Sequence, residues 1–191
     1  MKSNYLASGY YEQYNRAGSI RIWSLNTGLL IRTLTGHTDS VNSLVVLING
    51  YLVSASSDNT IKIWESNYGT VIKTLTGHSK SVNSLAVLKN GDLVSSSSDF
   101  TTCVWNSKYG IRQATMSSHT DSVNGLAVLE NGNLISVSSD ASVKVWTISR
   151  NGFNIQTLNG HSNVVNNLAV LDNDQFASSS ADKTVKIWGK I

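Results

Sequence analysis

The sequence predicts an all-β protein built from repeated four-stranded antiparallel sheets. Two observations carry this prediction: single residue types recur at one fixed step, and short alternating segments lie between turn signals. The tryptophans are Trp23, Trp64, Trp105, Trp146 and Trp188, with spacings of 41, 41, 41 and 42. The four histidines and an aspartate in each unit keep the same step: His37, His78, His119, His161, Asp58, Asp99, Asp140 and Asp182. Such a period is typical of repeats in which each unit is one small sheet.

The repeat divides residues 1–191 into about 4.5 units of one domain. The units are an incomplete one at 1–32, full ones at 33–73, 74–114 and 115–156, and a C-terminal one at 157–191 without its last strand. A chain of this length suits a single domain.

The full unit at 33–73 and the start of its successor illustrate the strands. Residues 40–47 alternate and then become continuously apolar, as expected of a buried strand. Asn49-Gly50 is a hairpin signal because both residue types tolerate positive φ. Strands are then expected at 51–56, 60–64 and 70–76, separated by Ser-Asp-Asn and Tyr-Gly turns.

Composition excludes several classes of function. The net charge is only +3 and no Lys/Arg run occurs, which makes nucleic acid an unlikely partner. No apolar stretch reaches about 18 residues and the N-terminus lacks a signal-peptide core, so we expect neither membrane spanning nor standard secretion. Cys103 is the only cysteine, which favours a cytoplasmic, reducing compartment.

A sheet of four short strands cannot bury both faces alone, and radial stacking of such sheets solves the problem. The pattern Gly-His, a buried strand, then L-x-S-x-x-x-D-x-x-x-K-x-W resembles the WD-repeat β-propeller family, over nearly the whole chain. This resemblance implies a β-propeller of four-stranded antiparallel blades. The sequence departs from the family pattern in two ways: no Asp follows any of the five tryptophans, and Ser118 replaces Gly before His119.

Each unit also brings together His, Ser and Asp, which has two interpretations. A hydrolase would use them as base, nucleophile and orienting carboxylate. The family resemblance instead implies a buried hydrogen-bond chain with Trp, and fourfold repetition favours this structural role. The four sets are His37, Ser54, Asp58 and Trp64; His78, Ser95, Asp99 and Trp105; His119, Ser136, Asp140 and Trp146; and His161, Ser178, Asp182 and Trp188.

Other chemistry finds little support in the sequence. One histidine per unit would be spaced around a ring, so we expect no metal site. The Asn-Gly pairs are turns and no phosphate-loop motif occurs, so we expect no cofactor. Cys103 replaces the Lys of other units and is expected to be an outward-facing free thiol.

Partner-binding residues follow from the resemblance by position. Family contact positions lie three and five residues after the His and one before the Asp, on one face of the ring. They are Ser40, Asn42 and Ser57; Ser81, Asn83 and Ser98; Ser122, Asn124 and Ser139; and Val164, Asn166 and Ala181. These are small residues with none of the Trp, Tyr or Arg typical of hot spots.

The incomplete first unit has a longer loop at 9–18, which is expected on the same face. It carries Tyr10, Tyr11, Tyr14 and Arg16, which suit a contact surface. The alternative is a mobile insertion near a chain end. A second aromatic set, Tyr68, Tyr109 and Phe153, is expected to pack against strands on the opposite face.

The leading functional hypothesis is a non-enzymatic scaffold that binds protein or peptide partners. The alternative is a self-assembling or structural propeller fragment whose main partner is another copy of itself. Counting strands favours a homodimeric ring, with residues 1–24 partly displaced and residues 29–35 completing the sheet that begins at Val164. The rival arrangement is five sheets in one chain, with three strands in each terminal sheet.

Overall fold

The computed structural model describes the chain except for residues 1–4, 12–16, 66, 150–151 and 190–191. The described part forms 18 strands in five antiparallel sheets and contains no helix. Sheet I contains β1 (Tyr5–Tyr11), β2 (Gly18–Ser24) and β3 (Leu30–His37). Sheet II contains β4 (Val41–Val46), β5 (Leu52–Ser56), β6 (Ile61–Glu65) and β7 (Thr70–Leu75). Sheet III contains β8 (Val82–Val87), β9 (Leu93–Ser97), β10 (Thr102–Asn106) and β11 (Ile111–Met116). Sheet IV contains β12 (Val123–Val128), β13 (Leu134–Ser138), β14 (Val143–Ser149) and β15 (Gly152–Leu158). Sheet V contains β16 (Val165–Val170), β17 (Phe176–Ser180) and β18 (Val185–Trp188).

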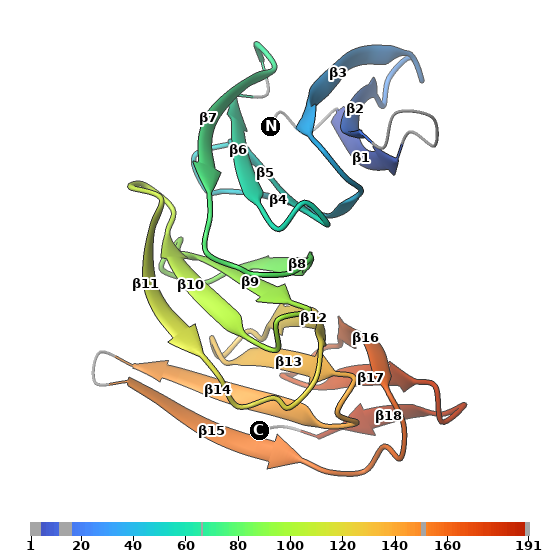
Figure 1. The fold of residues 1–191 in the computed structure, drawn as a ribbon. Helices are drawn as coiled ribbons and strands as arrows, with labels where there is room; N and C mark the ends of the chain where they lie inside the picture. Colours follow the sequence, from blue (N-terminus) through green and yellow to red (C-terminus); the bar gives the residue numbers. More distant parts are fainter. Residues whose placement is uncertain (1–4, 12–16, 66, 150–151, 190–191) are drawn as a thin grey trace.

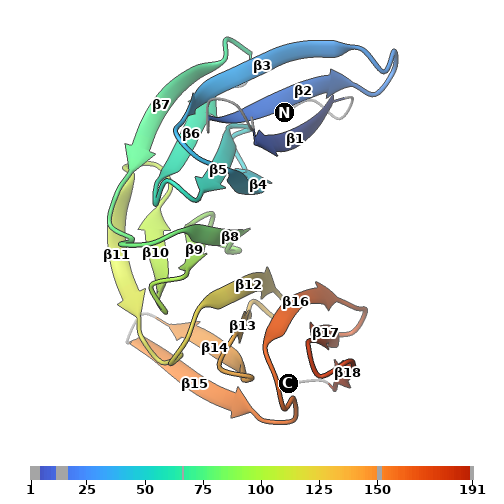
Figure 2. The same cartoon turned by 45° about the vertical axis from the view of Figure 1, so that its right-hand side comes forward.

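The five sheets follow one another along an arc (Figures 1 and 2). Strands β4, β8, β12 and β16 line its inner side, and β7, β11 and β15 lie on its outer side (Figure 2). The arc is open between sheet I and sheet V in this view. The predicted all-β class and repeated four-stranded sheets are therefore confirmed.

The core lies between neighbouring sheets. Val53 and Ile63 on one face of sheet II pack with Leu93 and Trp105 of sheet III, and all four are at most 2% exposed. The same arrangement recurs between sheets III and IV and between sheets IV and V. Each interior sheet thus has a Trp-bearing face toward the preceding sheet and an aliphatic face toward the following one, as period-2 alternation allows.

The Asn49-Gly50 hairpin is wider than the sequence predicts. Strand β4 ends at Val46 and β5 begins at Leu52, so five residues form the turn. Of the turn residues only Gly50 has a positive φ, at 86°, and its N–H donates to the Leu47 carbonyl at 2.8 Å. Glycine adopts this left-handed conformation without steric cost, which explains why it stands here.

The predicted pairing of residues 29–35 with the last sheet is wrong for the single chain. Strand β3 pairs antiparallel with β2, opposing Leu34 to Ile20, and residues 5–11 and 18–24 are strands in the same sheet. Leu34 and Ile20 are buried with Leu52 and Trp64 of sheet II. The short connection from β2 to β3 closes at little entropic cost, which favours this local pairing over a distant one. Sheet V consequently has three strands.

The turn before each third strand contains a residue with left-handed backbone. The φ values are 69° at Asn59, 73° at Phe100, 66° at Ala141 and 69° at Lys183.

We predict that Ala141→Gly raises the free energy of unfolding by about 1 kcal/mol, because it removes the Cβ crowding of this conformation. Urea unfolding followed by fluorescence measures the change. Asn59→Gly is the matched control and should change less, since Asn tolerates this region. A loss of stability in Ala141→Gly would contradict the explanation.

Candidate functional site

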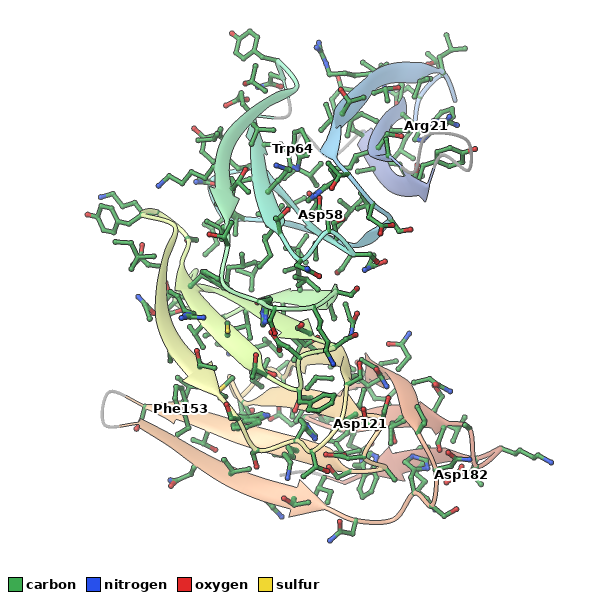
Figure 3. All side chains as sticks on the ribbon, viewed as in Figure 1. Arg21, Asp58, Trp64, Asp121, Phe153 and Asp182 are labelled. Atoms are coloured by element: carbon green, nitrogen blue, oxygen red, sulfur yellow. The ribbon has the colours of Figure 1, made fainter. Side chains whose placement is uncertain are left out.

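One hydrogen-bond chain runs through sheet II from a tryptophan to an aspartate. Trp64 on β6 lies on the sheet face toward sheet I (Figure 3). The strand register places Ser54 of β5 on the same face. The Trp64 Nε1–H donates to Ser54 Oγ at 2.8 Å, and Ser54 Oγ lies 2.7 Å from His37 Nε2. His37 Nδ1 lies 2.7 Å from Asp58 Oδ2. Because the indole only donates and the carboxylate only accepts, the protons of the chain all point toward Asp58 when His37 is neutral.

The same chain recurs in sheets III, IV and V with nearly constant geometry. The Trp–Ser distance is 2.8 Å in each of these sheets. The His–Ser distance is also 2.8 Å. The His–Asp distances are 2.8, 2.8 and 2.7 Å. The structure therefore brings together all four sequence-derived sets.

Each aspartate also fixes two backbone segments. Asp58 Oδ2 accepts the Thr38 backbone N–H at 3.0 Å, and Oδ1 accepts the Thr60 hydroxyl at 2.6 Å. In sheet IV, Asp140 accepts the Thr120 backbone N–H at 3.0 Å and the Ser142 hydroxyl at 2.6 Å. The carboxylate thus ties the loop after the His to the turn before the third strand.

These bonds shift the pKa values of the aspartates. Burial raises the pKa of Asp140, but bonds from Ser142, Thr120 and His119 outweigh it and lower the pKa to about 2. The same opposition leaves the pKa values of Asp58 and Asp99 below their usual range. For Asp182 the Thr184 hydroxyl bond is the largest cause of a lowered pKa. All four carboxylates are therefore ionised at neutral pH.

The geometry resembles a hydrolase triad but hides its nucleophile. The Ser54, Ser95 and Ser136 side chains are 0% exposed, and that of Ser178 is 1% exposed. Each Oγ already accepts an indole N–H and faces an imidazole nitrogen, so no acyl group has access to it. The arrangement instead gives every polar group of the buried chain a hydrogen-bond partner. Each such group left unpaired would cost about 1–3 kcal/mol of stability.

Sheet I contains a shortened form of the network that sequence reasoning missed. Trp23 Nε1–H donates to Ser8 Oγ at 3.0 Å, but sheet I has no strand bearing a His before β1 in the described chain. The signal was present, since Ser8 stands two residues after Leu6 as Ser54 does after Leu52. Trp23 is partly exposed, whereas Trp64 is buried.

The prediction that Cys103 faces outward is wrong. Its side chain is 1% exposed and packs among residues of sheet II, because this strand position faces the preceding sheet. The equivalent Lys62 and Lys144 extend along that face to donate to a Thr at its edge, and Cys103 Sγ lies 3.7 Å from the hydroxyl of the corresponding Thr115. Burial raises the pKa of Cys103, but neighbouring His78 outweighs it and lowers the pKa. The thiol is free.

Most of the Ser and Asn residues expected at a partner surface form a ladder between sheets. Asn42 Nδ2 donates to Ser57 Oγ at 3.0 Å, to Ser81 Oγ at 3.1 Å and to the Val82 carbonyl at 2.9 Å. Asn83 repeats these contacts one sheet further on, with Ser98, Ser122 and the Val123 carbonyl. Asn124 bonds Ser139 and the Val165 carbonyl. These side chains therefore hold adjacent sheets together; a role in partner binding stays a prediction.

The ladder stops at sheet V. Val164 stands at the position where Asn42 and Asn83 find Ser81 and Ser122. Asn124 therefore has one serine hydroxyl partner, Ser139, instead of two. Asn166, the next rung, is exposed. Ser40 sits at the other end, beside the Asp39 turn.

The aromatic residues of the first unit lie partly in strands. Tyr10 and Tyr11 belong to β1, not to a loop, and pair with Ser19 and Gly18. Tyr10 is 44% exposed, and the Arg21 guanidinium lies 4.2 Å from its ring centroid. Tyr14 and Arg16 lie outside the described residues.

The expectation that the second aromatic set packs against strands is wrong for Tyr68 and Tyr109. Tyr68 is 76% exposed, Tyr109 60% and Phe153 36%. Tyr68 and Tyr109 lie in turns, and Phe153 lies near the far end of the β14–β15 hairpin (Figure 3). The turns that carry Tyr68 and Tyr109 leave these two rings mostly exposed, whereas Phe153 on β15 lines a hollow with Leu88 and Val104.

Stacked four-stranded sheets, each closed by the same buried network, define this protein as a β-propeller. The chain belongs to the WD domain, G-beta repeat family, whose model matches residues 28–65, 69–106, 110–147 and 152–189. The crystal structure of the WD40 beta propeller domain of Doa1 is similar over this whole chain, with a TM-score of 0.84 and 25% identity. This chain spans 62% of that chain.

None of the curated proteins compared with this sequence matches it. No helix in the described residues is long and apolar enough to cross a membrane.

We predict that Trp105→Phe lowers the free energy of unfolding by about 1–3 kcal/mol, because it removes the indole donor and leaves the buried Ser95 hydroxyl underused. Thermal and urea unfolding measure the loss. Trp23→Phe is the matched control and should cost less, since Trp23 is partly exposed and its Ser8 partner is not joined to a histidine. Equal losses in the two variants would show that the network contributes nothing beyond ring packing.

We predict that acid destabilises the protein partly through Asp140. Its folded-state pKa lies below the unfolded value, so its stabilising contribution is complete above about pH 4 and is lost as the pH falls toward 2. Asp140→Asn should therefore be less stable than the parent at pH 7, and the difference should shrink on acidification. Asp172→Asn, an exposed carboxylate, should leave the profile unchanged. A difference between Asp140→Asn and the parent that is the same at pH 7 and pH 2.5 would exclude this linkage.

Proposed function

We propose that this chain is a non-enzymatic scaffold that binds protein or peptide partners. WD40 propellers are generally protein-interaction scaffolds. One observation carries the proposal for this chain: its catalytic-looking side chains are buried and hydrogen-bonded in four equivalent copies. A catalyst needs one accessible site, whereas four hidden copies serve the architecture. Function is then left to the exposed surface.

The terminal sheets supply the exposed apolar surface that partners use. In sheet I, Leu6 is 54% exposed, and Tyr10 stacks with Arg21 on the same side of the sheet. Tyr and Arg are enriched in binding hot spots. In sheet V, Val185 and Ile187 are 68% and 69% exposed. Scattered exposed apolar residues are ordinary, but these four gather on two uncovered faces.

Self-assembly is the second candidate, and the same uncovered faces favour it. Interior sheets bury a Trp-bearing face against an aliphatic face. Sheet I leaves uncovered a face of the first kind, with Leu6 and Trp23, and sheet V leaves one of the second kind. A head-to-tail contact between copies would join them. Light scattering across a wide concentration range separates the candidates, since a scaffold without self-association keeps the 20.7 kDa of one chain.

The scaffold proposal predicts binding without turnover. Selection from a displayed random-peptide library against the folded chain should enrich peptides that bind saturably. The chain should hydrolyse p-nitrophenyl acetate no faster than Ser95→Ala does, although that variant should be less stable. An enrichment of no peptide above background would refute the binding function. A hydrolysis rate that falls in Ser95→Ala while the variant remains folded would establish an enzyme instead.

A further inference from the structure

A hollow opens between sheets III and IV, which both have four strands. Its volume is about 480 Å³, within the range of about 300–1,000 Å³ that is typical of small-molecule sites. Leu88 and Val104 form its apolar wall on the side of sheet III, and Ile148 and Phe153 form the wall on the side of sheet IV. Leu88 and Val104 are 7% and 4% exposed and belong to the core between these sheets. The hollow therefore lies in the interior of the arc and does not depend on either terminal sheet.

A small side chain on β11 leaves room for the hollow. Three equivalent positions of the outermost strands carry Arg32, Lys73 and Ala114. Arg32 Nη1 donates to the Tyr68 carbonyl at 3.0 Å, and Lys73 Nζ donates to the Lys108 carbonyl at 2.7 Å. Each of these long side chains thus crosses to the outer turn of the following sheet. Ala114 is too short to cross, and it lines the hollow instead.

A second position enlarges the hollow and changes its charge. The residue before the second strand is Tyr51 in sheet II and Asp92 in sheet III. Tyr51 packs against the core between sheets II and III, whereas the smaller Asp92 lines the hollow. The boundary between sheets III and IV therefore has a carboxylate where the preceding boundary has a phenol. It also lacks the cation that Lys73 supplies to the preceding boundary.

The charge of the hollow is negative. Asp92 is the one ionisable side chain among the described residues that line it. Asn90 Nδ2 donates to Asp92 Oδ2 at 2.8 Å, and Oδ1 accepts no hydrogen bond within the described part of the chain. Lys89 lines an adjoining hollow with Gly132, and no ion pair joins it to Asp92 in the residues that the structure describes. One carboxylate beside apolar walls is complementary to a cation with an apolar body.

We propose that this hollow is a binding site for a small organic amine, in which one ammonium group is attached to an aromatic or aliphatic body. The ammonium group lies at the Asp92 carboxylate, and the apolar body contacts Leu88, Val104 and Phe153. A peptide fits this place less well, because its backbone N–H and C=O groups would face apolar walls without partners. The site goes beyond the proposed scaffold function and does not depend on it.

Titration of the full chain with phenethylamine, followed by nuclear magnetic resonance, tests the proposal. We expect saturable shifts of the Leu88 and Val104 methyl groups and of the Gln113 side-chain amide, which also lines the hollow. For so small a ligand the dissociation constant should be millimolar or lower. Phenethyl alcohol has the same body without the charge and should bind at least about threefold more weakly. Hydrocinnamate, whose carboxylate is repelled by Asp92, should bind more weakly still.

Two variants locate the site. Asp92→Asn keeps the shape and should remove the preference for the amine over the alcohol. Ala114→Lys introduces the side chain that sheet II has at this position, so the change is compatible with the fold. It fills the hollow and places a cation near Asp92, and it should weaken amine binding at least about tenfold. Gln156→Lys is the matched control, since it adds the same charge at the equivalent position of sheet IV and should leave binding unchanged.

Four outcomes would overturn the proposal. The first is no saturable binding of phenethylamine, and the second is a preference for the amine that survives in Asp92→Asn. The third is amine binding that persists in Ala114→Lys. The fourth is displacement of the amine by a lower concentration of an acetylated and amidated lysine tripeptide, which would make a peptide the occupant. The peptide selection tests the scaffold function separately, so a hollow that binds no amine leaves that function standing.

Discussion

The indole-to-carboxylate hydrogen bonds constrain sheets II to V from inside. An indole N–H can only donate and an ionised carboxylate can only accept. With a neutral imidazole between them, the serine hydroxyl therefore donates to the histidine and the histidine donates to the aspartate. Ser54 is 0% exposed and His37 2%, which means that water cannot replace a missing member. The Asp58 carboxylate then fixes the loop before β4 and the turn before β6. One buried chain in each of sheets II to V therefore joins the third strand and the second strand to both adjoining loops.

Repetition of this unit explains both the interior stability and the exposed ends. Both faces of each interior sheet pack against apolar faces of the neighbouring sheets. The Asn–Ser ladder adds hydrogen bonds across the same boundaries. Within the described residues, the first and last sheets have a neighbouring sheet on one side only, and each has three strands. The same regularity that stabilises the middle of the arc thus leaves apolar surface and unpaired backbone at its ends.

The sequence predicted the strands and the members of the network because both depend on local pattern or fixed spacing. Periodicity located β4 to β7 within about one residue, and the family resemblance joined Ser54 to Trp64. The sequence could not show the Asn–Ser ladder, because Asn42 and Ser81 are 39 positions apart and meet only when two sheets stack. It misplaced Cys103 because alternation assigns a strand residue to a face but does not say which face is covered. It assigned β3 to the wrong sheet because the edges of sheets I and V accept the same strand pattern.

Exchange of the indole N–H protons with deuterium tests the central claim most directly. Nuclear magnetic resonance resolves the five indole resonances of one sample without any substitution. The account predicts strong protection for Trp64, Trp105 and Trp146, whose indoles end in a buried network, and rapid exchange for Trp23, whose Ser8 partner is partly exposed. Exchange of Trp64, Trp105 and Trp146 as fast as that of Trp23, in the folded protein at neutral pH, would contradict it.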